Sequence, residues 1–589
     1  MMQDELNKLK GDQKIPFKIL MKRTLKYVIP EWYSFVLALI LIAANVVLDL
    51  YLPKIVMNIT NELLQDSFEY QTIINYSIAY ISISLASMVF IYFESMLLQR
   101  AGQKIIYKLR IDIFTHIENM SQNQFNEMPV GSLVTRVANY TQSMSDLFTN
   151  VLVNIVKNLV YVVAVYVYMY LISWQLSLIM LLPVTIVGVS SFIFSKVVHK
   201  RFKAERAAIS DMNTYLNENL SGMKITQIFN QQEFKEEEFN EKNKGLFKAK
   251  FGVTICFGIY RPFITLIYMV SVAVCFYYGF YFALEAGAIV AFYMYLSKFF
   301  NPVQQLADQL NNLQKALTAS ERLFNLMDVK PEVRDKEDAI DIDHFEGKIE
   351  FRNVWFAYVG EEWILKDVSF VIEPKQTVAF VGATGAGKTT ILGLIVRNFE
   401  IQKGQILIDD VDITNIKIKS LRRAVGQMLQ DVFLFSGTIK ENITLHDDSY
   451  SDERVMEVCK YVNADSFIDK LPNKLEYQVL QSGENFSQGQ RQLLSFARTV
   501  LANPQILILD EATANIDTET EVLIQESLEK IKNIGTMLVV AHRLSTIQHS
   551  DQIMVLQKGE IVEHGTHQEL LQMHGQYYKL YKLQYENKD

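Results

Sequence analysis

The chain has 589 residues and half of them are hydrophobic, so we expect more than one domain and look first for segments that cross a membrane. The formal net charge of −8 at pH 7 argues against a nucleic-acid-binding protein, in which positive charge is usually concentrated. The three cysteines, Cys256, Cys275 and Cys459, have no paired spacing, which argues against a disulfide framework and against a metal site built on cysteine.

The first segment, residues 1–30, is polar and basic. Within it, the stretch IPFKILMKRTLKYV mixes apolar and basic residues in an amphipathic pattern. This pattern is typical of a helix that lies along a membrane surface. We therefore expect residues 1–30 to form a cytoplasmic N-terminal helix that precedes the first membrane span.

Six apolar segments follow, each long enough to cross the hydrocarbon core as a helix. They cover residues 33–53, 72–94, 150–172, 174–195, 253–281 and 283–301. They predict a transmembrane domain over residues 31–315, interrupted by the charged residues Asp49, Glu94, Lys157 and Arg261. Because a charged side chain is costly in hydrocarbon, we expect Asp49, Lys157 and Arg261 to face the interior of the bundle or its cytoplasmic extension.

The connections between these spans differ in basic residues. Lys and Arg are frequent before the first span and in the connections after the second and fourth spans, and they are rare in the other three connections. Positive connections normally stay in the cytoplasm. The sequence therefore predicts a multi-pass protein of the cell membrane, with both termini in the cytoplasm. The two long connections are expected to be helical and continuous with the spans.

An acidic segment separates the spans from the rest of the chain, and we expect a linker over residues 316–347. Beyond it, in residues 348–589, short β-type runs such as TVAFVG, QILILDEA and TMLVVAH alternate with helical patterns. This alternation predicts an α/β domain with parallel strands, which begins after the last span and lies in the cytoplasm.

One strand of this domain leads into the loop GATGAGKTT and then into a helix. Gly382, Gly385 and Gly387 let the backbone wrap closely around a phosphate chain at the helix N-terminus. Lys388 is placed to reach the β- and γ-phosphates, and the Thr389 hydroxyl is placed to hold Mg²⁺. The alternative is a glycine-rich turn with a chance lysine. The pattern favours a site for ATP and Mg²⁺.

The segment ILILDEA provides a second part of this site. Its apolar residues predict a buried strand that places Asp510 and Glu511 at its carboxyl end, where ligands bind in such sheets. We expect Asp510 to anchor Mg²⁺ and Glu511 to accept a proton from an attacking water.

Three further residues follow or precede predicted strands of the same domain. Tyr358 is a candidate for stacking on adenine, although a lone tyrosine is more often part of a core. Gln430 is suited to contact Mg²⁺ or the attacking water, and His542 to bond a γ-phosphate. A lone histidine is more often structural, so these assignments depend on the whole set.

The order of these motifs, together with NFSQGQRQ and AHR, resembles the nucleotide-binding domain of an ATP-binding cassette (ABC) transporter. Six preceding spans with long loops resemble a type I ABC exporter half-transporter of the bacterial multidrug type. The resemblance covers about residue 15 to 585. It implies a six-helix transmembrane bundle fused to an α/β P-loop domain, and ATP hydrolysis coupled to transport.

In this family NFSQGQRQ corresponds to the signature loop, which closes over ATP held by a second cassette. The resemblance therefore implies a second ABC half-transporter as partner, and Ser487 and Gly489 would donate to the γ-phosphate. The implied catalytic residues are Glu511 and His542, and the implied Mg²⁺ ligands are Thr389, Gln430 and Asp510. The implied ATP-binding residues are Tyr358, Gly382, Thr384, Gly385, Gly387, Lys388, Thr389, Thr390, Gln430, Ser487, Gly489 and Gln490.

The signature loop departs from the family pattern. Phe486 and Gln488 stand where the family usually has Leu and Gly, and Gln481 stands where it usually has Glu. These departures resemble one subunit of an asymmetric pair with one competent and one impaired ATP site. We therefore expect a heterodimer. A homodimer that tolerates Gln488 is the alternative.

The resemblance implies an exporter that moves amphipathic drugs or lipids from the cytoplasm through the bilayer by alternating access. Loops around 130–142 and 211–224 would transmit cassette motion to the spans, and the second would dock on the partner's cassette. The alternatives are an ATP-gated regulatory or sensory membrane assembly and a homodimeric lipid flippase. The sequence does not identify the transported compound.

Overall fold

A computed structural model describes residues 14–65, 69–428, 432–510, 518–532, 534–540 and 547–585. The chain divides into two compact units. The helical unit comprises Met1–Glu118 and Met128–Val329, and the α/β unit comprises Asn119–Glu127 and Lys330–Asp589.

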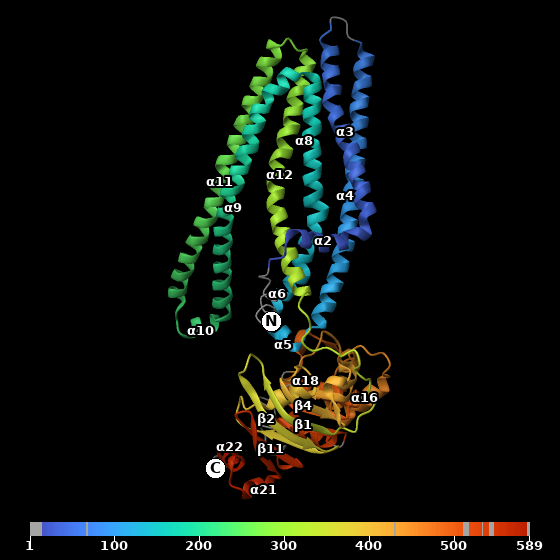
Figure 1. Cartoon of the computed structure of the whole chain (residues 1–589), viewed down its shortest axis with the longest axis vertical. Helices are drawn as coiled ribbons and strands as arrows, with labels where there is room; N and C mark the ends of the chain where they lie inside the picture. Colours follow the sequence, from blue (N-terminus) through green and yellow to red (C-terminus); the bar gives the residue numbers. More distant parts are fainter. Residues whose placement is uncertain are drawn as a thin grey trace. The chain divides into compact units, whose positions relative to one another are not determined.

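The helical unit consists of long helices joined by short turns (Figure 1). Its elements are α2 (Phe17–Val28), η1 (Ile29–Glu31), α3 (Trp32–Leu63), α4 (Tyr70–Glu118), α6 (Val130–Thr135), η2 (Arg136–Tyr140), α7 (Thr141–Asp146), η3 (Leu147–Leu152), α8 (Val153–Ile172), α9 (Trp174–Ser221), α10 (Met223–Ile228), α11 (Gln232–Tyr281) and α12 (Ala286–Met327). The amphipathic N-terminal segment is helical, as predicted, in α2.

Among the described residues, five helical stretches are long and apolar enough to cross a membrane. They are Phe17–Leu63, Tyr70–Glu118, Val130–Ile172, Trp174–Ser221 and Gln232–Tyr281. The sixth predicted span lies in α12, which is not apolar enough to be counted with them. Phe292, Tyr295 and Leu296 of α12 are buried in a core cluster with residues of α3 and α8. A helix surrounded by protein on these faces needs less apolar surface than one that faces lipid.

Asp49, Glu94 and Lys157, which lie within the predicted spans, form ion pairs inside this unit. Lys157 of α8 lies 3.1 Å from Glu94 of α4 (Nζ–Oε1), and Glu94 is buried. Lys298 of α12 lies 2.5 Å from Asp49 of α3 (Nζ–Oδ1). Asp49 also accepts a hydrogen bond from the hydroxyl of Tyr161 on α8. Charges placed among apolar helices are thereby compensated by partners on neighbouring helices.

Helices α9 and α11 lie side by side and are joined by α10 (Figure 1). They contain 48 and 50 residues, so the predicted helical continuation of the spans into the long connection is confirmed. Arg261 of α11 is not enclosed by the other helices of this unit. It is exposed in this chain, and its guanidinium lies 5.6 Å from the ring of Phe257.

The α/β unit contains two main sheets. Its strands are β1 (Ile349–Ala357), β2 (Trp363–Ile372), β3 (Thr377–Val381), β4 (Lys403–Ile408), β5 (Val411–Asp412), β6 (Val425–Met428), β7 (Gly437–Thr438), β8 (Gln478–Val479), β9 (Ile506–Asp510), β10 (Thr536–Val540), β11 (Gln552–Gln557) and β12 (Glu560–Gly565). Its described helices are α5 (Gln122–Asn126), α13 (Lys388–Ile395), η4 (Ile413–Asn415), α14 (Ile418–Ala424), α15 (Ile439–Thr444), α16 (Asp452–Tyr461), α17 (Asp465–Ile468), η5 (Lys474–Glu476), η6 (Gln481–Gly483), α18 (Gln488–Leu501), α19 (Thr518–Ile531), α21 (His567–Gln572) and α22 (Gln576–Tyr585).

The larger sheet has the strand order β12-β11-β3-β10-β9-β6, and its strands are parallel except for β12. Strands β3 and β10 are buried along their whole length, which explains why four consecutive residues of each are apolar. The other main sheet, β2-β1-β4-β5, is antiparallel. The prediction of parallel strands is therefore correct for the central sheet and does not extend to β1 and β4.

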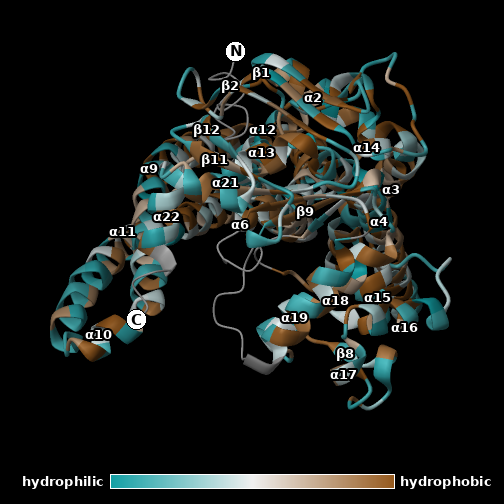
Figure 2. Cartoon of the chain, turned by 90° about the horizontal axis from the view of Figure 1, so that it is seen from below, coloured by the Kyte–Doolittle hydropathy of each residue, from teal (hydrophilic) through white to brown (hydrophobic). Residues whose placement is uncertain are grey.

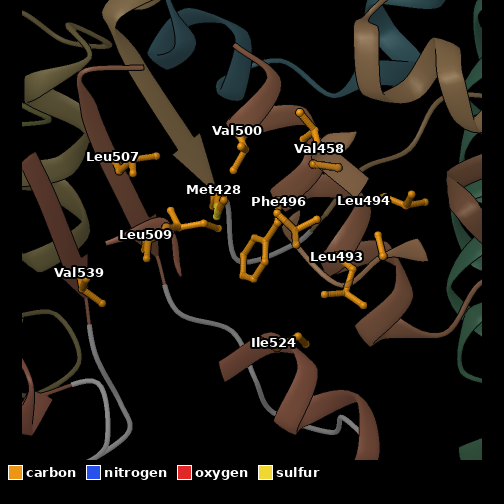
Figure 3. Close-up of a cluster of buried hydrophobic side chains, with 14 of the residues drawn as sticks. Met428, Val458, Leu493, Leu494, Phe496, Val500, Leu507, Leu509, Ile524 and Val539 are labelled. Atoms are coloured by element: carbon orange, nitrogen blue, oxygen red, sulfur yellow. The ribbon is translucent and has the colours of Figure 1, made fainter. Parts of the chain in front are cut away.

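Two hydrophobic clusters cover the faces of the central sheet. One packs the antiparallel sheet and α13 against it. The other packs α15, α16, α18 and α19 against it, and Figure 3 shows side chains of β6, β9 and β10 facing those of α16, α18 and α19. The central sheet is thus packed between two apolar layers. This packing fixes the positions of the carboxyl ends of its strands.

Two segments differ from the predicted domain layout. Residues 316–327 belong to α12 and are helical, where a linker is expected. Residues 119–127 group with the α/β unit. There, the Gln124 side-chain amide donates to the Lys330 carbonyl (2.8 Å), and the Ser121 hydroxyl donates to Glu332 (3.3 Å). Residues 130–142, which we expect to transmit motion, belong to the helical unit.

Candidate nucleotide-binding site

The loop between β3 and α13 has the backbone of a phosphate cradle. A Cβ atom on Gly382 would lie 2.3 Å from the carbonyl oxygen of Leu556, so only glycine fits there. Gly387, at the start of α13, has φ +104°, a left-handed conformation that favours glycine. The glycines therefore allow the chain to turn sharply and to present backbone amides ahead of the helix N-terminus.

Lys388 is buried at the centre of this loop. Its Nζ donates to the carbonyl oxygens of Gly382 (2.7 Å) and Ala383 (3.1 Å). Burial lowers the pKa of the ammonium group, and the negative charge of Asp510 opposes that shift. The loop thus holds a partly desolvated ammonium group against its own carbonyl oxygens. Phosphate oxygens of a bound nucleotide could replace these carbonyls as acceptors.

The Tyr358 side chain lies beside α13, the helix that follows this loop. Its hydroxyl lies 3.0 Å from the Thr390 hydroxyl, and its ring packs edge-on against Phe356 and Phe399, with centroids 4.9 and 5.2 Å away. The side chain is 38% exposed. The Tyr358 ring is held perpendicular to two aromatic neighbours and keeps accessible surface on which a base can stack.

The strand order brings the carboxyl ends of the strands that precede the remaining motif segments to one edge of the sheet. The parallel strands β3, β10, β9 and β6 are neighbours, and Phe380, Val540 and Asp510 lie in register across the first three. The carboxyl ends of these strands lead to the phosphate loop, to 541–546, to 511–517 and to 429–431, respectively. The carboxyl ends of parallel strands are where such sheets bind ligands.

The predicted residues His542, Glu511 and Gln430 lie in the last three of these segments, outside the described residues. Their roles stay predictions. Thr384 and Thr389 are exposed on the loop, and Thr389 and Asp510 supply the oxygen ligands that Mg²⁺ prefers. The residues present therefore fit a nucleotide triphosphate with its magnesium ion.

Comparison with known proteins identifies the family. The model of the ABC transporter transmembrane region matches residues 32–303, and the model of the ABC transporter domain matches residues 365–514. The chain belongs to the ABC transporter family. It joins one transmembrane region to one ATPase domain, as in half-transporters, and its ATP hydrolysis is coupled to transport across the membrane in which its helices lie.

Two relatives and one solved structure illustrate the similarity. A probable multidrug resistance ABC transporter ATP-binding/permease protein of Bacillus subtilis is 37% identical, over 85% of this chain and 75% of that protein. A fatty acid ABC transporter ATP-binding/permease protein of Mycobacterium bovis is 36% identical, over 85% of this chain and 80% of that protein. The structure of a bacterial Atm1-family ABC exporter with ATP bound has a TM-score of 0.78 at 26% identity, over 94% of this chain and 98% of that one.

The ABC signature loop begins helix α18. The Ser487 hydroxyl accepts from the Gln490 amide (3.2 Å), and the Gln490 side chain accepts from the Ser487 amide (3.0 Å). This reciprocal pair caps the helix. Helix α18 packs in the cluster with α15, α16 and α19, whereas α13, which begins with Lys388, packs in the other cluster. The two motifs therefore belong to different layers of one ABC domain.

The departures in this ABC signature loop are accommodated locally. Phe486 is buried, and its ring packs against those of Phe467 and Tyr477, with centroids 6.1 and 5.9 Å away. Gln488 is the exposed first residue of α18 and is not among the residues with positive φ. The backbone at this position therefore does not require a glycine.

Three residues beside the phosphate loop were not predicted from the sequence. A cavity of about 290 Å³ is bounded on one side by Thr384 and Gly385 and on another by Gln557, Lys558 and Gln576. The last three come from the end of β11 and the start of α22. They are more than 170 positions along the chain from the loop, and no local pattern marks them.

Proposed function

We propose that this chain is one half of an exporter that moves amphipathic drugs or lipids out of the cytoplasm by alternating access. The observation that carries the proposal is the length of α9 and α11, 48 and 50 residues. At 1.5 Å per residue these helices extend about 70 Å, more than twice the ~30 Å hydrocarbon core. Such helices are suited to carry cassette motion into the spans. The names of two relatives refer to multidrug resistance and fatty acids, which supports an amphipathic cargo.

The distribution of basic residues supports a cytoplasmic position for both termini and the ATPase domain. In this orientation the α9–α10–α11 hairpin extends into the cytoplasm. Residues 119–127, which group with the α/β unit through Gln124 and Ser121, are in our proposal one link between the cassette and the spans.

The tip of the hairpin provides a second link. Ile225, Ile228 and Phe229 are between 64% and 69% exposed, and part of the ribbon at α10 is brown in Figure 2. Apolar side chains gathered at the end of a hydrophilic hairpin favour burial against another surface. We propose that α10 docks on the cassette of a second half-transporter.

For hydrolysis, we propose that Lys388 and the loop amides hold the phosphates and that Thr389, Asp510 and Gln430 hold Mg²⁺, which neutralises phosphate charge when bound. Glu511 then accepts the proton of the attacking water, and His542 bonds the γ-phosphate.

Ser487, Gly489 and Gln490 serve the nucleotide of the other chain in this proposal. The exposed Ser487 lies at an N-terminus whose helix dipole favours an anion. We further propose that the second chain is a different half-transporter. The support is the altered signature, in which the side chain of Gln488 stands in the first turn of α18, at the end that would face the phosphate.

Transport is tested with the complete assembly in proteoliposomes. We expect ATP-dependent movement of a fluorescent amphiphile, and ATPase activity that rises when the amphiphile is added. A Lys388→Ala variant serves as the inactive control. ATPase activity insensitive to every amphiphile tried, without movement, would instead favour a regulatory assembly.

The pairing is tested with two substitutions. Glu511→Gln removes the base, so turnover should fall by about 10²–10⁴-fold. If the altered signature serves an impaired site, Ser487→Ala should reduce turnover far less, and Gln488→Gly should raise it only modestly. Comparable losses from both substitutions, or full activity of this chain alone, would show a homodimer.

A further inference from the structure

A cavity of about 710 Å³ lies at the end of the helical unit that we place in the cytoplasm, between α9, α12 and the segment of η2 and α7. It is distinct from the nucleotide site, which belongs to the other unit. Its size falls within the range of small-molecule sites in proteins. Its lining is strongly basic: His199, Lys203, Arg206, Lys315 and Arg322.

The basic residues come from two helix faces. Positions 199, 203 and 206 of α9 follow helical spacing, and so do positions 315 and 322 of α12. Residues three, four or seven positions apart lie on one face of a helix. Two cationic faces are therefore turned toward the same volume.

Among the described residues, no carboxylate balances the charges of this cavity. None of the residues that line it is Asp or Glu. Among the ion pairs in the described part of the chain, none includes Lys203, Arg206, Lys315 or Arg322. Arg322 donates to the neutral hydroxyl of Tyr140 (2.9 Å).

Like charges around one volume repel one another, and a cavity focuses their field on whatever enters. An anion that enters is attracted by the whole set. A guanidinium group can donate two hydrogen bonds to one phosphate, and an ammonium group can donate single bonds to it. A phosphate therefore suits a cavity that contains both groups.

We propose that this cavity binds a phosphate-bearing anion through Lys203, Arg206, Lys315 and Arg322. The headgroup of an anionic phospholipid and a soluble phosphate compound share this chemistry. The first part of the cavity, at His199, begins four residues beyond the predicted span 174–195, which at 1.5 Å per residue is about 6 Å. Lys203 follows that span by eight residues, and Lys315 follows the predicted span 283–301 by 14, which are about 12 and 21 Å. A lipid headgroup at the membrane surface is therefore nearer to the His199 end of the cavity than to its far end, and both sources of phosphate are compared in the test. The inference concerns binding and does not depend on which compound is exported.

The test uses the complete transporter in detergent, with phosphatidylglycerol as the anionic probe and phosphatidylcholine of the same acyl chains as the zwitterionic reference. Binding is followed by native mass spectrometry. A Lys203→Gln/Arg206→Gln/Lys315→Gln variant removes cavity charge and keeps Arg322 with its bond to Tyr140. The matched control, Lys200→Gln/Lys224→Gln/Lys242→Gln, removes the same charge from exposed positions of the hairpin that do not line the cavity.

We expect the unmodified protein and the control to prefer phosphatidylglycerol, and the cavity variant to bind it about tenfold more weakly, since charged hydrogen bonds are lost. Lys203→Arg/Lys315→Arg should retain binding because it retains charge. Displacement of the lipid by inorganic pyrophosphate would show that soluble phosphate compounds share the site, and resistance to it would assign the site to lipid. Equal loss in the cavity variant and the control, or no binding of either probe, would overturn the proposal.

Discussion

Lys298 of α12 and Asp49 of α3 form an ion pair with a Nζ–Oδ1 distance of 2.5 Å, and Tyr161 of α8 bonds the same carboxylate. One turn earlier on α8, Lys157 pairs with Glu94 of α4. Positions 157 and 161 share a helix face. One face of α8 therefore bonds both α3 and α4, and α12 is joined to α3 at the same carboxylate.

The first prediction concerns this pair. Lys298→Met leaves Asp49 without its cation among apolar helices, so stability should fall by about 1–3 kcal/mol, less than for a fully buried pair because both side chains are about a quarter exposed. The double variant Asp49→Asn/Lys298→Met removes both charges and should be more stable than the sum of the single effects predicts. Thermal unfolding in detergent measures both quantities, and strict additivity would show that the pair is not coupled.

The second prediction concerns nucleotide binding. Lys388→Ala removes a buried cation that faces the phosphate loop, so affinity for ATP at this chain's site should fall by about 10–100-fold, as expected for lost charged hydrogen bonds. Titration with a fluorescent ATP analogue measures the change. Lys419→Ala, at an exposed position of α14, is the matched control and should leave affinity unchanged. Unaltered affinity in Lys388→Ala would exclude this loop as the phosphate site.

The third prediction separates two roles of Tyr358. If its ring stacks on adenine, Tyr358→Ala should weaken binding by about 1–3 kcal/mol, by analogy with base–aromatic stacking. Tyr358→Phe keeps the ring and loses only the contact with the Thr390 hydroxyl, so it should bind nearly as well as the unmodified protein. The same titration distinguishes them. Equal weakening by Phe and Ala would assign the effect to the hydroxyl contact and not to stacking.

The fourth prediction concerns the unusual Phe486. Because its ring is buried against Phe467 and Tyr477, Phe486→Ala should destabilise the ATPase domain by about 3–5 kcal/mol. Phe486→Leu restores the residue usual in the family and retains most of the apolar volume, so it should cost less than about 1.5 kcal/mol. Calorimetry of the complete protein can compare the transitions. An unchanged unfolding temperature in Phe486→Ala would mean that the ring does not stabilise this core.

The sequence by itself determined the features that depend on neighbouring residues. Long apolar runs specify helices of membrane length, and the loop GATGAGKTT, with Gly387 at φ +104° before Lys388, needs only local backbone freedom. The buried strand before Asp510 is likewise visible in four consecutive apolar residues. These properties follow from local conformation and local hydrophobicity, so a single sequence reveals them.

Only the tertiary structure decided which distant residues meet. Three findings depend on packing between segments far apart in the chain. Strands β1 and β4 form a separate antiparallel sheet, Gln124 joins the α/β unit, and Lys298 neutralises Asp49. The same holds for the basic cavity, where Lys203 and Lys315 are 112 positions apart in the sequence. The type of a side chain predicts that a buried charge needs a partner. Which residue becomes that partner depends on how helices and sheets pack, and no local sequence pattern indicates it.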